Sequence, residues 1–242
     1  MAHDFWIEPS TFHPAVGETV MAGLRVGQDF FGDPVGRDPK AIEKFVVRDA
    51  KGEHPVAGID FQDPAGYVQV DSPGLAVVGY RSRPAFLTLP PEKFDEYLKL
   101  EGLERIVTWR AEHGQSKQPS RELFSRCAKS LLSTGAGKGA RFDEPLGFRL
   151  EIVPESNPYA AKGPMTFRLT FDGKPLQGAL VIAMNQNDPQ AKASARSDRS
   201  GRVTFPIAKP GVWLIKSVHM IAAPAGSNAE WESLWASLTF ER

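Results

Sequence analysis

The sequence has a single cysteine, no net charge and no long apolar run. Cys127 is the only cysteine among 242 residues, so the chain forms no intrachain disulfide and no thiolate metal cluster. Lys plus Arg and Asp plus Glu number 29 each, which leaves no net field to attract nucleic acid or an anionic membrane. No stretch approaches the roughly 20 apolar residues of a membrane-spanning helix. We therefore expect no nucleic-acid partner and no membrane span.

The motifs of common enzyme classes are missing as well. The sequence contains neither a G-x-S-x-G elbow nor an H-E-x-x-H helix, and it has no local Cys/His pair. The Gly-rich segment STGAGKGARFDEP (133–145) lacks the G-x-x-x-x-G-K-[ST] spacing of a phosphate loop. We expect no enzyme, and an enzyme built on a His/carboxylate metal centre is the weakest of three hypotheses.

Glycine (22) and proline (20) are abundant and spread along the chain, which is typical of short strands joined by turns. The segment ETVMAGLRVG (18–27) alternates apolar and other residues with a period of two, which indicates a half-buried strand. Residues 145–242 contain further strand-like segments at regular spacing, which favours a β-sandwich. The sequence predicts a mainly β fold of two antiparallel β-sandwich domains, at 3–89 and 141–242.

Residues 90–140 differ from both β blocks, and we expect them to form a helical insert with a Gly-rich linker. The segment PPEKFDEYLKLEGLERIVTWRAEHG (90–114) begins with prolines that suit the first turn of a helix. A second helix is predicted from Ser120, a good N-cap, because apolar residues then recur every three or four positions. Cys127 would be a small buried residue of this helix.

The chain opens with MAHDFWIEP, a dense group of functional side chains where most chains fray. Trp6 and Ile7 are expected to anchor this end, which would hold His3 at an ordered edge. We expect Met1 and Ala2 to be residues added before a mature, exported chain that starts at His3. The alternative is a cytosolic protein that starts at Met1.

The segments DGKPLQGALVIA and ARSDRSGRVTFPIAKPGVWLIKSVHM resemble a transthyretin-type or carboxypeptidase-regulatory-like sandwich, an Ig-like architecture. In combination with HDFWIEP, PVGR, SRCAKSLL, LEIVPESNPY and WESLWASLTF, they resemble an exported bacterial family of unknown function. That family is associated with nickel or cobalt uptake as NikK- or NikM-like periplasmic components. The resemblance implies a periplasmic location and a role with a transition metal.

His3 and His219 are the principal candidate ligands for a divalent transition metal (Ni, Co, Cu or Zn), because both match positions of the family pattern and imidazole suits Ni, Cu, Zn and Fe. At a mature N-terminus, His3 would chelate with its α-amine and its imidazole. His219 shares a strand face with Trp213 and Ile215, so we expect it to be partly buried. The structural alternatives are a polar residue hydrogen-bonded at a strand edge for His3 and a hydrogen-bonded core imidazole for His219.

Two carboxylates complete the candidate set. Asp4 is either a ligand beside His3 or a turn acceptor, and Glu232 is either a metal carboxylate, a group that orients a ligating imidazole, or a solvated neighbour of Trp231. The other three histidines are expected to be exposed and incidental: His13, His54 and His113.

The sequence therefore predicts a periplasmic protein that binds a transition-metal ion or its chelate, nickel or cobalt being favoured. It would deliver this cargo to a membrane metal-uptake transporter. The alternative is a metal-free structural or protein-interaction module of the cell envelope.

Overall fold

Three β-sheets and one pair of helices make up the part of the chain described by the computed structural model, residues 3–135 and 145–242. The N-terminal sheet contains β1 (Asp4–Pro9), β2 (Thr19–Gln28), β3 (Phe31–Val35) and β6 (Gly66–Gln69). The C-terminal sheet contains β10 (Leu150–Pro154), β11 (Met165–Phe171), β12 (Lys174–Pro175) and β15 (Arg202–Phe205). The helical pair consists of α1 (Pro91–Leu100) and α2 (Glu104–Glu112).

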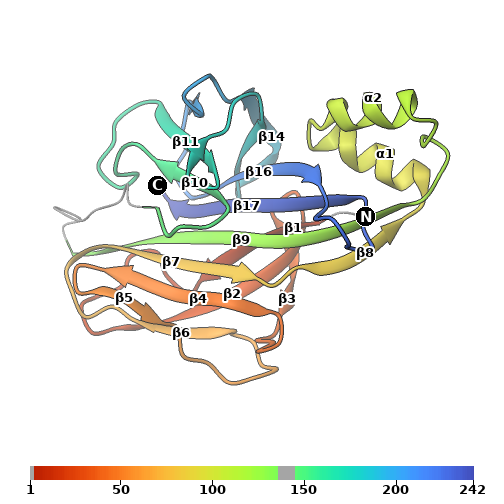
Figure 1. The fold of residues 1–242 in the computed structure, drawn as a ribbon. Helices are drawn as coiled ribbons and strands as arrows, with labels where there is room; N and C mark the ends of the chain where they lie inside the picture. Colours follow the sequence, from red (N-terminus) through yellow and green to blue (C-terminus); the bar gives the residue numbers. More distant parts are fainter. Residues whose placement is uncertain (1–2, 136–144) are drawn as a thin grey trace.

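A nine-stranded sheet, here called the long sheet, runs through the centre of the molecule (Figure 1). Its strands lie in the order β14 (Asp188–Arg196), β13 (Leu180–Asn185), β16 (Val212–Ala222), β17 (Trp231–Glu241), β9 (Ser120–Thr134), β7 (Gly74–Ser82), β4 (Ile42–Asp49) and β5 (Gly52–Pro55). The ninth strand, β8 (Ala85–Leu89), pairs with the first part of β9. Strands β17 and β9 run parallel, and the other described pairs run antiparallel.

The long sheet carries a smaller sheet on each face. In β9, Cys127 and Leu131 point into the core shared with the C-terminal sheet, whereas Ala128 and Leu132 point into the core shared with the N-terminal sheet. Because successive side chains of a strand point to opposite faces, the two smaller sheets cover opposite faces of the long sheet. The predicted mainly β fold with sandwich packing is confirmed, and strands from both predicted β blocks meet in this one sheet.

The predicted helix that starts at Ser120 is wrong, because residues 120–134 form β9. This strand is covered on both faces, so its apolar residues do not alternate with polar ones. Apolar residues at adjacent positions on both faces also satisfy a helical spacing, and the pattern alone could not separate the two structures. Cys127 is buried, as predicted, but in the central strand.

The first predicted helical segment is present as the helical pair, α1 and α2. Phe94, Tyr97 and Leu98 form the buried face of α1 and pack with Val218 and Trp235 of the long sheet. The pair lies at one end of the long sheet, beside the N-terminus (Figure 1). No helix in residues 3–135 and 145–242 is long and apolar enough to cross a membrane.

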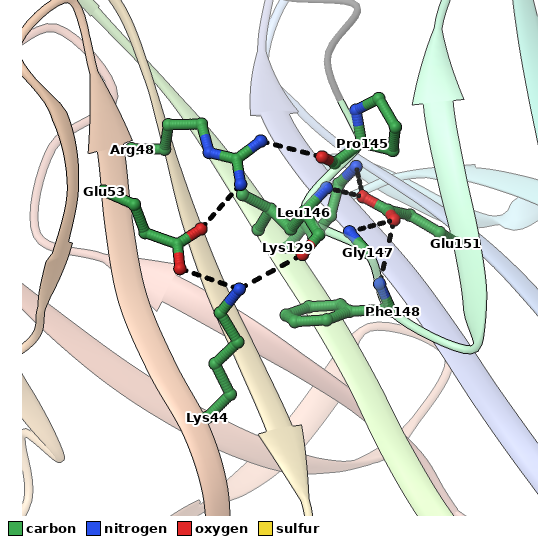
Figure 2. Close-up of polar contacts among 9 residues, drawn as sticks. All are labelled: Lys44, Arg48, Glu53, Lys129, Pro145, Leu146, Gly147, Phe148 and Glu151. Atoms are coloured by element: carbon green, nitrogen blue, oxygen red, sulfur yellow. Dashed lines mark hydrogen bonds and ion pairs between the residues drawn. The ribbon is translucent and has the colours of Figure 1, made fainter. Parts of the chain in front are cut away.

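A buried ion pair fixes the chain where it leaves the Gly-rich linker, of which residues 136–144 lie outside the described part (Figure 2). Lys129 Nζ lies 2.8 Å from Glu151 Oε1, and the two side chains are only 3% and 1% exposed. The Glu151 carboxylate also accepts hydrogen bonds from the backbone N–H groups of residues 146–148. Arg48 donates to the carbonyl oxygen of residue 145, and Lys44 donates to that of residue 146. The backbone of residues 145–148 is therefore hydrogen-bonded both to Glu151 and to side chains of β4.

Candidate functional site

The N-terminus is anchored as predicted. Trp6 and Ile7 are 1% and 0% exposed, and the Thr239 hydroxyl of β17 donates to the Ile7 carbonyl at 2.8 Å. The Arg126 guanidinium donates to the His3 carbonyl at 2.6 Å. These contacts hold the backbone of His3 while its imidazole is exposed and makes no described hydrogen bond or ion pair.

His3 and Asp33 line the same open hollow at the edge of the N-terminal sheet, with a volume of about 460 Å³. Phe5 and Asp33 both lie opposite Val26 in the strand register, so these three side chains share one face of the sheet. His3 precedes Phe5 by two residues and continues that face. Asp33 is exposed, and its carboxylate has no described ion pair. One imidazole and one carboxylate therefore border the same space without a competing partner in the described chain.

A close backbone approach shapes the floor of this hollow. Gly27 and Gly32 lie directly opposite each other in β2 and β3. A Cβ on Gly27 would stand 1.9 Å from the Phe31 carbonyl oxygen, and one on Gly32 would stand 2.5 Å from the Trp6 ring. Both positions therefore require glycine, because real Cβ atoms do not come this close to other heavy atoms.

Asp4, the predicted neighbour ligand of His3, is occupied by an ion pair. Its Oδ1 lies 2.6 Å from Lys216 Nζ, and the same ammonium lies 2.8 Å from Glu101 Oε1 at the end of α1. All three side chains are almost completely buried. Asp4 is thus committed to a lysine on the long sheet and points away from the open hollow.

His219 lies on the other face of β16 and packs on Phe171 of the C-terminal sheet, with ring centroids 4.7 Å apart. Burial, and then the positive charge of Arg105, lower the pKa of His219 to about 4, so the imidazole is neutral near pH 7. Glu232 faces the same side, and its Oε1 accepts a charge-assisted hydrogen bond from Arg149 at 2.6 Å. Arg149 also binds Asp172 at 3.2 Å.

The structure brings His219 and Glu232 to one face of the long sheet and places His3 and Asp4 on the N-terminal-sheet side. The predicted pairing of His3 with His219 is not found, because the long sheet separates their surroundings. In residues 3–135 and 145–242, no group of three or more His, Cys, Asp or Glu side chains is arranged to hold a metal ion. The remaining histidines, His13, His54 and His113, are exposed as predicted.

Three further residues of the structure, Asp33, Lys216 and Glu122, were not predicted from the sequence. The signal that could have identified Asp33 was its place in FFGDPV, a short strand beside a glycine-containing hairpin. Glu122 lies in the strand that was predicted as a helix, so its burial was hidden. Burial raises the pKa of Glu122 to about 7, although the Ser233 and Tyr97 hydroxyls donate to its carboxylate.

Comparisons with known proteins give one family match. No curated protein matches the chain. Among solved structures, the chain is similar to the D0-D1 domain of intimin, at 11% identity over 99% of this chain and 98% of that chain, with a TM-score of 0.21. It is also similar to dimeric latent PorU from Porphyromonas gingivalis, at 12% identity over 96% of this chain and 20% of that chain, with a TM-score of 0.21.

A family model described as a domain of unknown function, DUF4198, matches residues 1–221. The match begins at the N-terminal strand and includes most of the long sheet, the helical pair and the strand that carries His219. It covers far more than half of the chain. The protein therefore belongs to the DUF4198 family.

Proposed function

We propose that the protein binds a divalent transition-metal ion, or its small chelate, at the open hollow between His3 and Asp33. The observation that carries this proposal is that an imidazole and a carboxylate border one hollow and neither has a described ion-pair partner. The ligand set differs from the one expected from the sequence, because Lys216 and Arg149 neutralise Asp4 and Glu232.

Two protein donors suit a carrier better than a permanent metal site. Imidazole and carboxylate ligands are compatible with Ni, Co, Cu and Zn, and a site with two protein ligands leaves coordination positions for water or a chelator. Such a site releases its cargo readily to a receptor that offers more ligands. The proposal therefore includes a periplasmic location and a membrane metal-uptake transporter as the receiving partner, supported by the resemblance of the sequence to exported uptake components.

Isothermal calorimetry tests the proposed site. Ni(II), Co(II), Cu(II) and Zn(II) are titrated into metal-stripped protein and into the variants His3→Ala and Asp33→Asn. We expect binding tighter than about 100 μM in the unaltered chain and a loss of about tenfold or more in each variant. His219→Ala and the exposed-histidine control His54→Ala should bind as the unaltered chain does. Weaker binding than this, or equal binding by His3→Ala, contradicts the proposal.

The start of the chain provides a second test. A chain that begins at His3 presents a free α-amine next to the imidazole, and the two groups form a chelate ring on one ion. We expect this chain to bind Cu(II) and Ni(II) more tightly than the chain with Met1 and Ala2. Equal affinity of the two chains would show that the α-amine takes no part.

A metal-free interaction module remains the second candidate, and exposed aromatic rings favour it. Phe31 and Phe61 are 68% and 74% exposed, and Phe61 adopts a φ of 64°. Bulky residues rarely adopt this conformation, and such strained positions cluster at functional surfaces. Site-directed photo-crosslinking at Phe31 and Phe61 in the producing cell tests this candidate. A specific crosslinked envelope protein together with no metal affinity would favour the module over the carrier.

A further inference from the structure

Lys216 connects two parts of the molecule that are far apart in the sequence. Its ammonium group lies 2.6 Å from the Asp4 carboxylate at the start of β1 and 2.8 Å from the Glu101 carboxylate at the end of α1. The strand next to His3 and the helical pair are thus held by the same cation. The long sheet supplies that cation from β16.

Two buried carboxylates share one ammonium group in this bridge. Both carboxylate oxygens contact the same nitrogen, at 2.6 and 2.8 Å, so they lie at most about 5.4 Å apart, a distance at which like charges repel appreciably. Burial is the largest effect on Glu101 and raises its pKa, and the charge of Asp4 acts in the same direction. The two carboxylates in turn raise the pKa of Lys216 against the effect of burial.

A second cation lies near the bridge without joining it. Burial lowers the pKa of Arg126 to about 10, and the charges of Asp4 and Glu101 act against this effect. Arg126 forms no ion pair with a carboxylate in the described chain. Its guanidinium binds the His3 carbonyl and lies 4.8 Å from the centroid of the Trp235 ring. Trp235 stacks on Tyr97 of α1 at 5.4 Å. A second chain of contacts, aromatic and independent of Lys216, therefore also joins the start of β1 to the helical pair.

We propose that Lys216 is a shared ionic bridge through which the position of the helical pair sets how firmly the strand that carries His3 is held. When the Glu101 carboxylate moves away, the Lys216 ammonium group interacts with the Asp4 carboxylate without a competing negative charge. The hold on β1 therefore strengthens as the end of α1 loosens. If both carboxylates left, the buried ammonium would lose its partners, which is strongly unfavourable.

The use of this bridge rests on the proposed function, because it would let a partner that displaces the helical pair change the mobility of His3 and of its cargo. The coupling itself requires no metal. It is therefore tested in metal-free protein, and failure of the metal titration leaves this test unaffected.

Amide hydrogen exchange, measured residue by residue in solution, compares Glu101→Gln with the unaltered chain. Glutamine keeps the size of the side chain and an oxygen acceptor for Lys216 but removes the charge. We expect the β1 amides of Phe5 to Ile7 to exchange about three- to tenfold more slowly, because the competing charge is gone. The amides at the end of α1, from Glu101 to Leu103, should exchange faster.

Glu96→Gln is the matched control, since Glu96 is exposed on the same helix and pairs only with Lys93 at 3.6 Å. It should change neither set of amides. Lys216→Met removes the bridge and should accelerate exchange in both β1 and α1. Opposite changes in Glu101→Gln support the bridge, whereas unchanged or faster exchange in β1 overturns it. If Lys216→Met does not fold, the two glutamine variants still decide the question.

Discussion

Replacement of the buried Glu122 by glutamine (Glu122→Gln) tests how strongly an ionised carboxylate at this position destabilises the fold. The side chain is 2% exposed beneath the helical pair. Its Oε1 accepts hydrogen bonds from the Tyr97 hydroxyl at 3.2 Å and from the Ser233 hydroxyl. Its Oε2 has no hydrogen-bond partner among residues 3–135 and 145–242. When this carboxylate is ionised, its hydrogen bonds within the protein therefore do not fully replace those that it would make to water.

The size of the effect follows from the pKa of Glu122, which burial raises from 4.5 to about 7. The folded state thus binds the proton more tightly than the unfolded state. This tighter proton binding stabilises the folded state fully below pH 4.5, and the stabilisation is lost as the pH rises through about 7. A difference of about 2.5 pKa units corresponds to about 3 kcal/mol. Glutamine cannot ionise, and its oxygen still accepts both hydroxyl hydrogen bonds.

Urea unfolding at pH 5 and pH 8 measures the difference in free energy of unfolding between Glu122→Gln and the unaltered chain. We expect a small difference at pH 5 and a gain of up to about 3 kcal/mol for the variant at pH 8. Glu96→Gln, at an exposed position of α1, is the matched control for the substitution itself. Groups that titrate equally in both proteins cancel in the difference. A gap of equal size at both pH values would refute the assignment of a near-neutral pKa to Glu122.

Three further predictions follow from the contacts described above. The lowered pKa of His219 means that the fold loses stability as the pH falls from 6.5 towards 4, so urea unfolding of His219→Asn should show less of this acid loss; an unchanged acid slope would contradict it. Lys129→Met leaves the Glu151 carboxylate buried without its ammonium partner, and its urea midpoint should fall by an amount equivalent to about 3–5 kcal/mol; a loss below about 1 kcal/mol would mean that the backbone N–H groups alone suffice. Gly32→Ala places a Cβ 2.5 Å from the Trp6 ring and 2.8 Å from the Val26 carbonyl oxygen, so thermal unfolding should show a loss of about 1–3 kcal/mol in the free energy of unfolding. An unchanged Tm would mean that both the ring and the neighbouring backbone shift without cost.

The local pattern of the sequence identifies β2 as a strand but not β9. In β2, apolar side chains alternate with exposed ones, and the period of two is visible in the sequence. Strand β9 lies at the centre of the long sheet between two cores. Adjacent apolar residues of β9, such as Cys127 and Ala128, face opposite cores, so apolar and polar residues do not alternate along this strand. The structure of this segment is decided by the strands that pair with it and by the two cores, which the local pattern does not report.

The candidate site was predictable only where a side chain needs no distant partner. His3 was identified because it matches the family pattern, and its ordered position follows from the neighbouring Trp6 anchor, which depends on local hydrophobicity. The fate of Asp4 depends on Lys216, which is 212 residues further along the chain. Similarly, Glu232 is neutralised by Arg149, 83 residues away. No local pattern reports such ion pairs, because they arise from how the sheets are stacked.

These ion pairs also determine where a metal ion would bind most easily. To bind Asp4, a metal would have to displace the Lys216 ammonium, which would leave a buried positive charge without one of its two carboxylates. Separating a buried ion pair is unfavourable, because the charged groups lose a partner that compensates the cost of their burial. Binding at Glu232 would likewise displace Arg149. At His3 and Asp33 only water is displaced, because both side chains are exposed and have no described ion-pair partner. Among the candidate ligands in the described chain, this pair therefore requires the least rearrangement to bind a metal ion.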